Sequence, residues 1–403
     1  MSQADDRQAD DTVAAPVPVR SIALLSAAAF ASAATARVAD PLLPQVAEEF
    51  GTTIASASVI ATGFTLAYGL CQVIYGPVGD RYGKYTLITM MTLLSALGTG
   101  LAALAGDLGT LGALRLLAGA TAAAIIPLSM AHIGDIVAYE NRQPVLARFM
   151  SGQILGVIAG QAFGGAVGEW VGWRGVFVAL AAIYLLIGAL LWRELRSTGV
   201  VQTRTAVSRA GLVSNYLALA RSTRVRLVLG VVFVEGMLFF GGFTFVGAFV
   251  RQAYGMDYTA IGLLLATFGI GALLYTSMAP RIVAALGQRN MVLAGGALLA
   301  PAFALFALAP SWWWLPLPIA LCGLGFYLFH NTLQTQATQM APHARGIAVS
   351  VFAACFFLGQ SAGVALGGRL AELWGYSPLF LGVAAALPVL AVLFRAQLGR
   401  LPT

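Results

Sequence analysis

Five ionisable side chains stand inside long apolar runs of this 403-residue sequence: Arg37, Asp40, Arg115, Glu235 and His330. An ionisable group within an apolar helix is costly unless it is paired or hydrated, so each is a candidate for binding a proton or a ligand. Burial favours the neutral form of a carboxylic acid, and a nearby arginine favours the carboxylate. The two carboxylates therefore have the chemistry of a proton switch, and the arginines have the chemistry to control it.

The elements that carry these residues are predicted to be membrane-spanning helices. The sequence is 59% hydrophobic and only 10% charged, with a mean hydropathy of +0.84. Its apolar runs of about 20 residues have the length that crosses a bilayer as a helix. We predict an all-α membrane protein with twelve spans, at 21–43, 54–75, 85–105, 109–131, 145–167, 173–192, 227–250, 259–279, 291–309, 314–337, 346–367 and 377–395.

The distribution of positive charge predicts the orientation. Of the 23 lysines and arginines, 18 fall on the side that holds both termini, 3 on the other side and 2 within spans. Positive residues accumulate in cytoplasmic loops, so both termini are expected in the cytoplasm, in a multi-pass protein of the cell (inner) membrane. Six of the seven tryptophans then lie near the outer interface, as in an aromatic belt.

Composition divides the chain into four parts. Residues 1–20 are predicted to be a disordered cytoplasmic tail, 21–193 and 226–398 two six-helix bundles, and 194–225 an arginine-rich cytoplasmic linker. The stretch around 212–219 is amphipathic enough to lie on the membrane surface, but a solvated linker fits equally well.

An internal repeat relates the two bundles. A shift of 203 positions superimposes Glu169 on Glu372, together with glycines in the fifth and eleventh spans. Glycines four residues apart form a smooth helix face that lets another helix approach closely. The predicted helix-packing glycines are Gly152, Gly156, Gly160, Gly164, Gly165, Gly359, Gly363, Gly367 and Gly368. Such duplication is frequent in transporters, whose substrate site lies between repeats near the bilayer midplane.

A polar segment at 76–85 is predicted to be a short loop between the second and third spans. Its spacing, G-x-x-x-D-R-x-G-K, resembles the signature of the major facilitator superfamily. The resemblance implies a gating role for Gly76, Gly79, Asp80, Arg81, Gly83 and Lys84. It also implies that Asp80 meets the start of the eleventh helix, near 345–349, where the helix dipole is positive.

Two further patterns resemble the proton-coupled drug and metabolite exporters of that superfamily. Arg115-Leu116-Leu117-Ala118-Gly119 is similar to the arginine motif of the fourth helix, and the glycines of the fifth span are similar to the antiporter motif. The exporter pattern has proline directly after Gly160, where this chain has Gln161. This departure keeps proton-coupled uptake open as an alternative.

The resemblance implies a central cavity between helices one, four, seven and ten. The expected proton-coupling and substrate residues are therefore Arg37, Asp40, Arg115, Glu235, His330, Asn331 and Gln334. By depth, Arg115 is expected near Arg37 and Asp40, and His330 near the level of Glu235. Structural roles remain alternatives: snorkelling to the interface for Arg37 and Asp40, a bond between helices for Glu235, and packing for His330.

The leading hypothesis is export of a small amphiphilic compound, a drug or metabolite, in exchange for protons. We favour Glu235 as the coupling group because no positive residue lies near it in the sequence. Proton-coupled uptake and a non-transporting membrane sensor are the alternatives. Enzymatic activity, cofactors, metals and nucleic-acid partners are not expected, since three well-separated histidines and the lack of a G-x-x-x-x-G-K-[ST] motif offer no such site. The expected partners are the substrate, protons and the lipid bilayer, and the protein is expected to be a monomer.

Overall fold

The computed structural model describes residues 19–197, 216–217, 219, 221–341 and 345–398, and these ranges contain helices and no strand. Nearly all of the predicted tail and most of the predicted linker lie outside them. The helices are α1 (Val19–Arg37), α2 (Ala39–Glu49), α3 (Ile54–Ala57), α4 (Val59–Tyr82), α5 (Lys84–Ala102), α6 (Leu108–Ala122), α7 (Ile125–Ile136), α8 (Tyr139–Ser197), α10 (Thr223–Phe243), α11 (Val246–Tyr254), α12 (Tyr258–Ala266), α13 (Phe268–Leu308), the 3-10 turn η1 (Trp312–Trp314), α14 (Pro316–Gln339), α15 (Arg345–Trp374) and α16 (Tyr376–Leu398).

Ten helical segments of the described chain are long and apolar enough to cross a membrane. Two of them, Asn141–Ser197 and Tyr258–Leu308, have 57 and 51 residues, about twice the length that one crossing needs. Each turns back at a glycine with positive φ, Gly172 (φ 72°) and Gly287 (φ 64°), a conformation that other residues resist. The ten segments therefore make twelve crossings, which confirms the predicted fold class.

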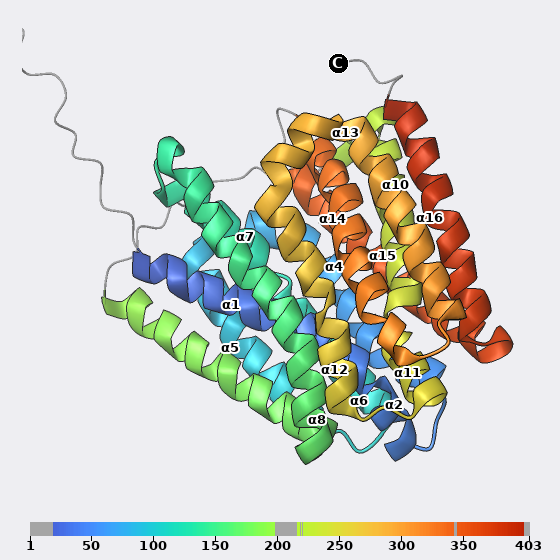
Figure 1. The fold of residues 1–403 in the computed structure, drawn as a ribbon. Coiled ribbons are helices and arrows are strands. Elements are labelled where there is room, and N and C mark those ends of the chain that lie inside the picture. The colour runs from blue at the N-terminus through green and yellow to red at the C-terminus, as the bar shows by residue number, and fades with distance from the viewer. Residues whose placement is uncertain (1–18, 198–215, 218, 220, 342–344, 399–403) are drawn as a thin grey trace, which may run out of the picture.

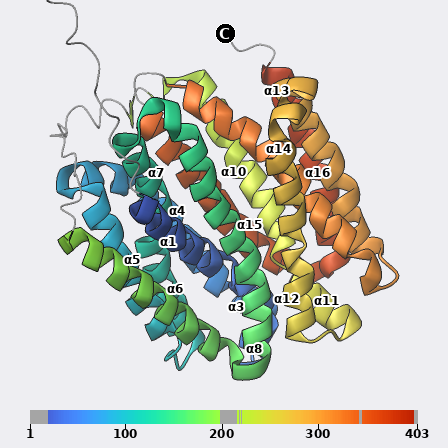
Figure 2. The same ribbon diagram turned by 60° about the vertical axis from the view of Figure 1, so that its left-hand side comes forward.

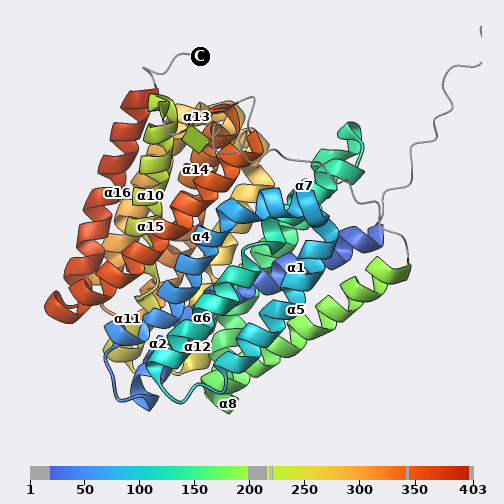
Figure 3. The ribbon, with the colours of Figure 1, turned by 180° about the vertical axis from the view of Figure 1, so that it is seen from behind.

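The helices form two groups. In Figure 1 the blue-to-green helices α1–α8 gather on one side and the yellow-to-red helices α10–α16 on the other, and Figures 2 and 3 show the same division from other directions. We call the end where α2 leads into α3 the Glu49 end, and the end where α4 leads into α5 the Asp80 end. The described chain begins and ends at the Asp80 end (Figure 1).

The same glycine contact occurs once in each group. In the first group α8 packs on α1. Three glycines of α8 lie against main-chain atoms of residues spaced four apart: Gly156 on Phe30, Gly160 on Ala34 and Gly164 on Val38. In the second group α15 packs on α10, with Gly359 on Phe233, Gly363 on Met237 and Gly367 on Gly241. Each residue of the second set stands 203 positions after its counterpart in the first. The repeat in the sequence is thus a repeat of three-dimensional contacts.

Two helix pairs make the most extensive contacts between the groups, α8 with α12 and α4 with α15. At the first junction Gly165 lies against the carbonyl oxygen of Tyr258. At the second, Gly69 faces the carbonyl oxygen of Ala354, 3.1 Å from where a Cβ would stand. These close approaches bring the candidate residues of the two groups to a shared interior.

Candidate functional site

The junction of α1 and α2 holds Arg37 and Asp40. Both are buried, with 7% and 1% of their surface exposed, and their charged atoms lie 3.7 Å apart. The Arg37 guanidinium also lies over the ring of Phe240 from α10, 4.0 Å from its centre. Arg37 Nη1 and Asp40 Oδ2 have no hydrogen-bond partner among the described residues. The pair therefore sits inside the protein, against the second group, which argues against snorkelling to an interface.

Arg115 of α6 is fully buried in the same region. Its Nε donates to the carbonyl oxygen of Ile60 at 2.8 Å, and Nη2 donates to that of Thr35 at 3.1 Å. Its guanidinium lies over the ring of Phe64, 4.5 Å from the centre. Arg115 lies next to the first span as expected, but in the described structure its bonds go to main-chain oxygens and not to Asp40. Arg115 therefore ties α1, α4 and α6 together.

Glu235 of α10 and His330 of α14 are in direct contact. His330 Nδ1 and Glu235 Oε2 are 2.9 Å apart, and Glu235 is 1% exposed. No positive residue lies near Glu235 in the sequence, and its partner comes from a span 95 residues away. The second oxygen, Oε1, has no partner among the described side chains. One proton can therefore be shared within this pair while one carboxylate oxygen stays available.

Aromatic rings separate the Glu235–His330 pair from Arg37. The His330 ring stacks on Phe326 at 5.0 Å and lies 4.5 Å from Phe356. The ring of Phe240, over which the Arg37 guanidinium lies, has its centre within 6 Å of the ring centres of both these phenylalanines. The candidate residues thus form two polar sites, one in each group, with an apolar aromatic layer between them.

Asn331 and Gln334 follow His330 on α14 and are partly exposed. Their side chains make no hydrogen bond to any other described residue, so both amides are free to meet a ligand or water. Gln161 of α8 differs, because it is fully buried and neither its Oε1 nor its Nε2 has a hydrogen-bond partner among the described atoms.

The 76–85 segment is not the loop that its polar composition predicted. Helix α4 continues to Tyr82, and only Gly83, at φ 96°, leaves the helical conformation before α5 begins. A single glycine makes the turn because positive φ costs it little. Lys84 Nζ then lies 2.9 Å from Asp80 and 2.7 Å from Asp135 of α7. The charges are therefore held on helix ends in fixed geometry.

The described partner of Asp80 is Lys84. The expected contact of Asp80 with the start of the eleventh helix stays a prediction, because the Arg345 side chain lies outside the described part of the chain. Arg81 points elsewhere and lies over the ring of Tyr82, 5.3 Å from its centre. Asp135 was not predicted from the sequence because it stands alone at the polar end of a span, where an acidic residue is unremarkable.

The Glu49 end contains a second set of polar contacts that the sequence did not suggest. The backbone N–H of Tyr258, at the start of α12, donates to Glu169 at 2.6 Å, and the Tyr258 hydroxyl donates to Glu48 at 3.2 Å. Both bonds run between the two groups. Glu49 accepts hydrogen bonds from Trp173 and Arg174 within the first group. The two groups are therefore linked by hydrogen bonds at this end.

Comparison with known proteins identifies relatives over most of the chain. The family model of the Major Facilitator Superfamily matches residues 25–257 and again 231–402. An uncharacterized MFS-type transporter, YceJ of Bacillus subtilis, is 23% identical over 362 residues, 87% of this chain and 89% of the relative. A chloramphenicol resistance protein of Pseudomonas aeruginosa is 25% identical, over 81% of this chain and 77% of the relative.

Solved structures share the fold. A bacterial homolog of the human lysosomal transporter Spinster, in an inward-facing and unoccupied conformation, superimposes with a TM-score of 0.73. It is 18% identical, and the match covers 95% of this chain and 96% of the other. The two-group helical architecture is therefore that of known transporters.

Proposed function

Because this chain belongs to the major facilitator superfamily, we propose that it is a secondary active transporter that exports a small amphiphilic compound in exchange for protons. Transport by this multi-pass membrane protein would proceed by alternating access, with the substrate bound between the two groups. We propose that the protein lies in the inner membrane with both termini in the cytoplasm, because the charge distribution favours this orientation.

The contact between Glu235 and His330 is the observation that carries this proposal. A carboxylate that is 1% exposed, with one oxygen on an imidazole and the other without a described partner, can exist with or without a proton. In its charged form it would attract a cationic or hydrogen-bond-donating group of the substrate. A proton bound to the same carboxylate removes that attraction. Proton and substrate then exclude each other, which is the condition for exchange.

The surrounding rings supply the apolar part of the site. Phe326 and Phe356 pack on His330, and binding pockets for amphiphilic compounds are lined mainly by such side chains with a few polar groups. Asn331 and Gln334 are candidates for those polar groups, and Arg37, Asp40 and Arg115 for a second charged site. The relative that is named for chloramphenicol resistance supports export as the direction.

The segment at 76–85 is proposed as the gate at the Asp80 end. Lys84 joins Asp80 of α4 to Asp135 of α7, so movement of either helix must stretch or break an ion pair. When the Asp80 end opens or closes, the ion pairs of Lys84 with Asp80 and Asp135 would be replaced by contacts with other groups.

Proton-coupled uptake is the second candidate, because Gln161 stands where the exporter pattern has proline. Gln161 lies at the junction with α12, where its carbonyl oxygen meets Gly262, 2.6 Å from where a Cβ would stand. A glutamine leaves α8 with a backbone N–H that proline would remove. The direction of coupling decides between the two candidates.

A flux assay in proteoliposomes with an imposed pH gradient tests the proposal, with cationic dyes and small metabolites as trial substrates. We expect uphill movement of substrate against the proton flow in the wild-type protein. Glu235→Gln should abolish gradient-driven accumulation, since the amide cannot release a proton. Asp107→Asn, an acid-to-amide change at an exposed helix cap, is the matched control and should behave as the wild type. Gradient-dependent flux through Glu235→Gln would refute the role of Glu235, and co-directional flux would establish uptake.

A further inference from the structure

A cavity of about 630 Å³ lies at the Glu49 end, away from the Glu235–His330 pair. It is lined by the start of α3 from the first group and by the ends of α11 and α15 and the start of α16 from the second. This volume is in the range of pockets that hold small organic molecules. Because both groups contribute to its wall, the cavity depends on how the groups meet at this end.

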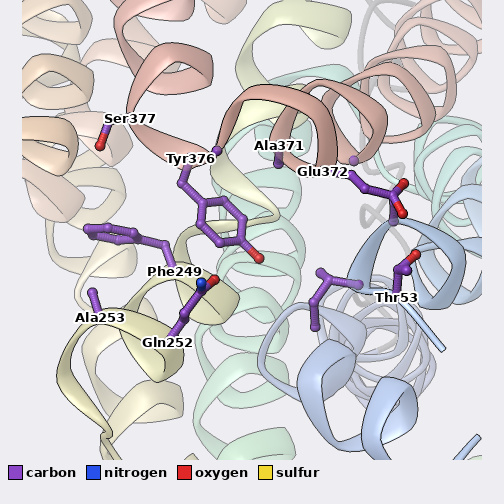
Figure 4. A pocket seen from close by; sticks show the side chains of 12 residues that line it. Thr53, Phe249, Gln252, Ala253, Ala371, Glu372, Tyr376 and Ser377 are labelled. Carbon is purple, nitrogen blue, oxygen red and sulfur yellow. The ribbon is translucent and has the colours of Figure 1, made fainter. Parts of the chain in front are cut away.

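Two kinds of wall face each other across this cavity (Figure 4). The rings of Tyr376 and Phe249 and the amide of Gln252 lie on one side, and the carboxylate of Glu372 and the hydroxyl of Thr53 lie on the other. The two rings pack edge to face with their centres 6.0 Å apart. An aromatic wall opposite a carboxylate is an arrangement that suits a cation with an apolar body, because ring faces and carboxylates both attract positive charge.

The internal repeat pairs Glu372 with Glu169, but Glu372 does not make the hydrogen bond that Glu169 makes. Glu169 accepts a hydrogen bond from the backbone N–H of Tyr258, and this bond closes the junction of α8 and α12. The equivalent pair, 203 positions away in each case, is Glu372 and Ala55. A Cβ on Gly368 would stand 3.1 Å from the Cα of Ala55, so Gly368 approaches Ala55 as Gly165 approaches Tyr258. Yet the described structure has no hydrogen bond between Glu372 and Ala55, and both residues line the cavity.

The only described partner of Glu372 is Arg369, whose Nη1 lies 3.3 Å from Oε2. The Arg369 side chain is 75% exposed, so water screens this pair and it holds the carboxylate weakly. The other carboxylate oxygen has no described partner. A ligand cation can therefore approach Glu372 without breaking a buried contact.

We propose that this cavity is a binding site for an organic cation that carries an aromatic or similar apolar body. Glu372 supplies the opposite charge, Tyr376 and Phe249 supply the ring faces, and the Gln252 amide oxygen accepts a hydrogen bond where the cation has an N–H. The site is separate from the Glu235–His330 pair, and it does not depend on proton coupling. A bound cation would contact both groups and hold them together at the Glu49 end.

Isothermal titration calorimetry on the full-length protein in detergent tests this site with benzyltrimethylammonium as the probe. Benzyl alcohol and phenylacetate are the neutral and anionic controls of similar size. We expect the cation to bind more tightly than both controls. Equal binding of cation and alcohol would overturn the proposal, because charge would then play no part.

Three variants locate the bound cation. Glu372→Gln should weaken binding roughly fivefold, the effect of about 1 kcal/mol for one partly exposed charge pair. Arg369→Gln, at an exposed position, should strengthen binding because it removes a competing positive charge. Tyr376→Leu should weaken binding through loss of the ring. If Arg369→Gln leaves the affinity unchanged, or if Glu235→Gln alone abolishes binding, the cation is held elsewhere and the proposal fails.

Discussion

Glu235 and His330 share a 2.9 Å contact inside an aromatic enclosure, and this geometry makes them one hydrogen-bonded unit. The loss of one member should therefore disable the other. The pair differs in this respect from Arg115, which acts through main-chain oxygens.

The first prediction concerns this unit. His330→Gln should reduce gradient-driven flux strongly, and the double variant Glu235→Gln/His330→Gln should lose no more than Glu235→Gln alone. Initial rates in proteoliposomes, measured for all four proteins at several imposed gradients, give the coupling. Losses that multiply in the double variant would show that the two groups act independently.

A second prediction concerns Arg115. Arg115→Lys keeps the charge but loses the forked geometry that reaches both Ile60 and Thr35, so it should lower the free energy of unfolding by about 1–3 kcal/mol. Unfolding in mixed micelles with increasing SDS measures this change. Arg226→Lys, at an exposed arginine of α10, is the control and should change stability little. Equal stability of the two variants would contradict a bracing role for Arg115.

At the scale of helices, the glycines of α8 and α15 set the distance between neighbouring spans. Gly363 is so close to Met237 that a Cβ would overlap the Met237 carbonyl oxygen. The approach of α4 to α15 at Gly69 is looser, because a Cβ there would stand 3.1 Å from the nearest carbonyl oxygen. The α4–α15 junction is therefore packed less tightly than the contacts within each group, whereas the α8–α12 junction is as tight, since a Cβ on Gly165 would stand 2.2 Å from the Tyr258 carbonyl oxygen.

The third prediction follows from that packing. Gly363→Ala should destabilise the protein by forcing α15 away from α10. Gly382→Ala, at a helical glycine of α16 with open space around it, should be neutral or slightly stabilising. SDS unfolding and the yield of monodisperse protein separate the two outcomes. Similar behaviour of both variants would show that the contact between α15 and α10 tolerates a methyl group at Gly363.

The sequence predicted the number and type of spans and the register of the repeat, because apolar length and glycine spacing are local patterns. It did not predict that Asp80 lies within a continuous helix, since three glycines and three charges favour a loop. It suggested that Glu235 and His330 share a depth, but their contact depends on helix rotation. The bonds of Arg115 to carbonyl oxygens have no sequence signature, because every residue carries a carbonyl.

At the scale of the molecule, the two ends are held differently. At the Glu49 end, Tyr258 bonds to Glu169 and Glu48 across the groups. At the Asp80 end, the ion pairs of Lys84 stay within the first group. Breaking the bonds at the Glu49 end would favour a conformation that is open there.

The fourth prediction tests this difference. Glu169→Gln replaces a charged acceptor at the α12 N-terminus with a weaker neutral one, at a cost of about 1 kcal/mol, so the open population should rise roughly fivefold. Spin labels on Leu104 and Leu308, exposed residues at the Glu49 end of each group, report the distance between the groups. Glu372→Gln is the matched control, since it breaks no bond between groups. A distance distribution identical to the wild type in Glu169→Gln would remove this bond from the conformational balance.

The hydrogen bonds of Arg115 to main-chain oxygens also have a genetic consequence. A screen for second-site suppressors can rescue the loss of Arg37 by removing Asp40, because a side chain that has lost its partner can itself be deleted. No equivalent rescue exists for Arg115, since Ile60 and Thr35 offer it carbonyl oxygens that every substitution retains. Positions 60 and 35 should therefore accept many residues of suitable size, while position 115 should tolerate no substitution. Strains that lose Arg115 should recover only through a further mutation of codon 115.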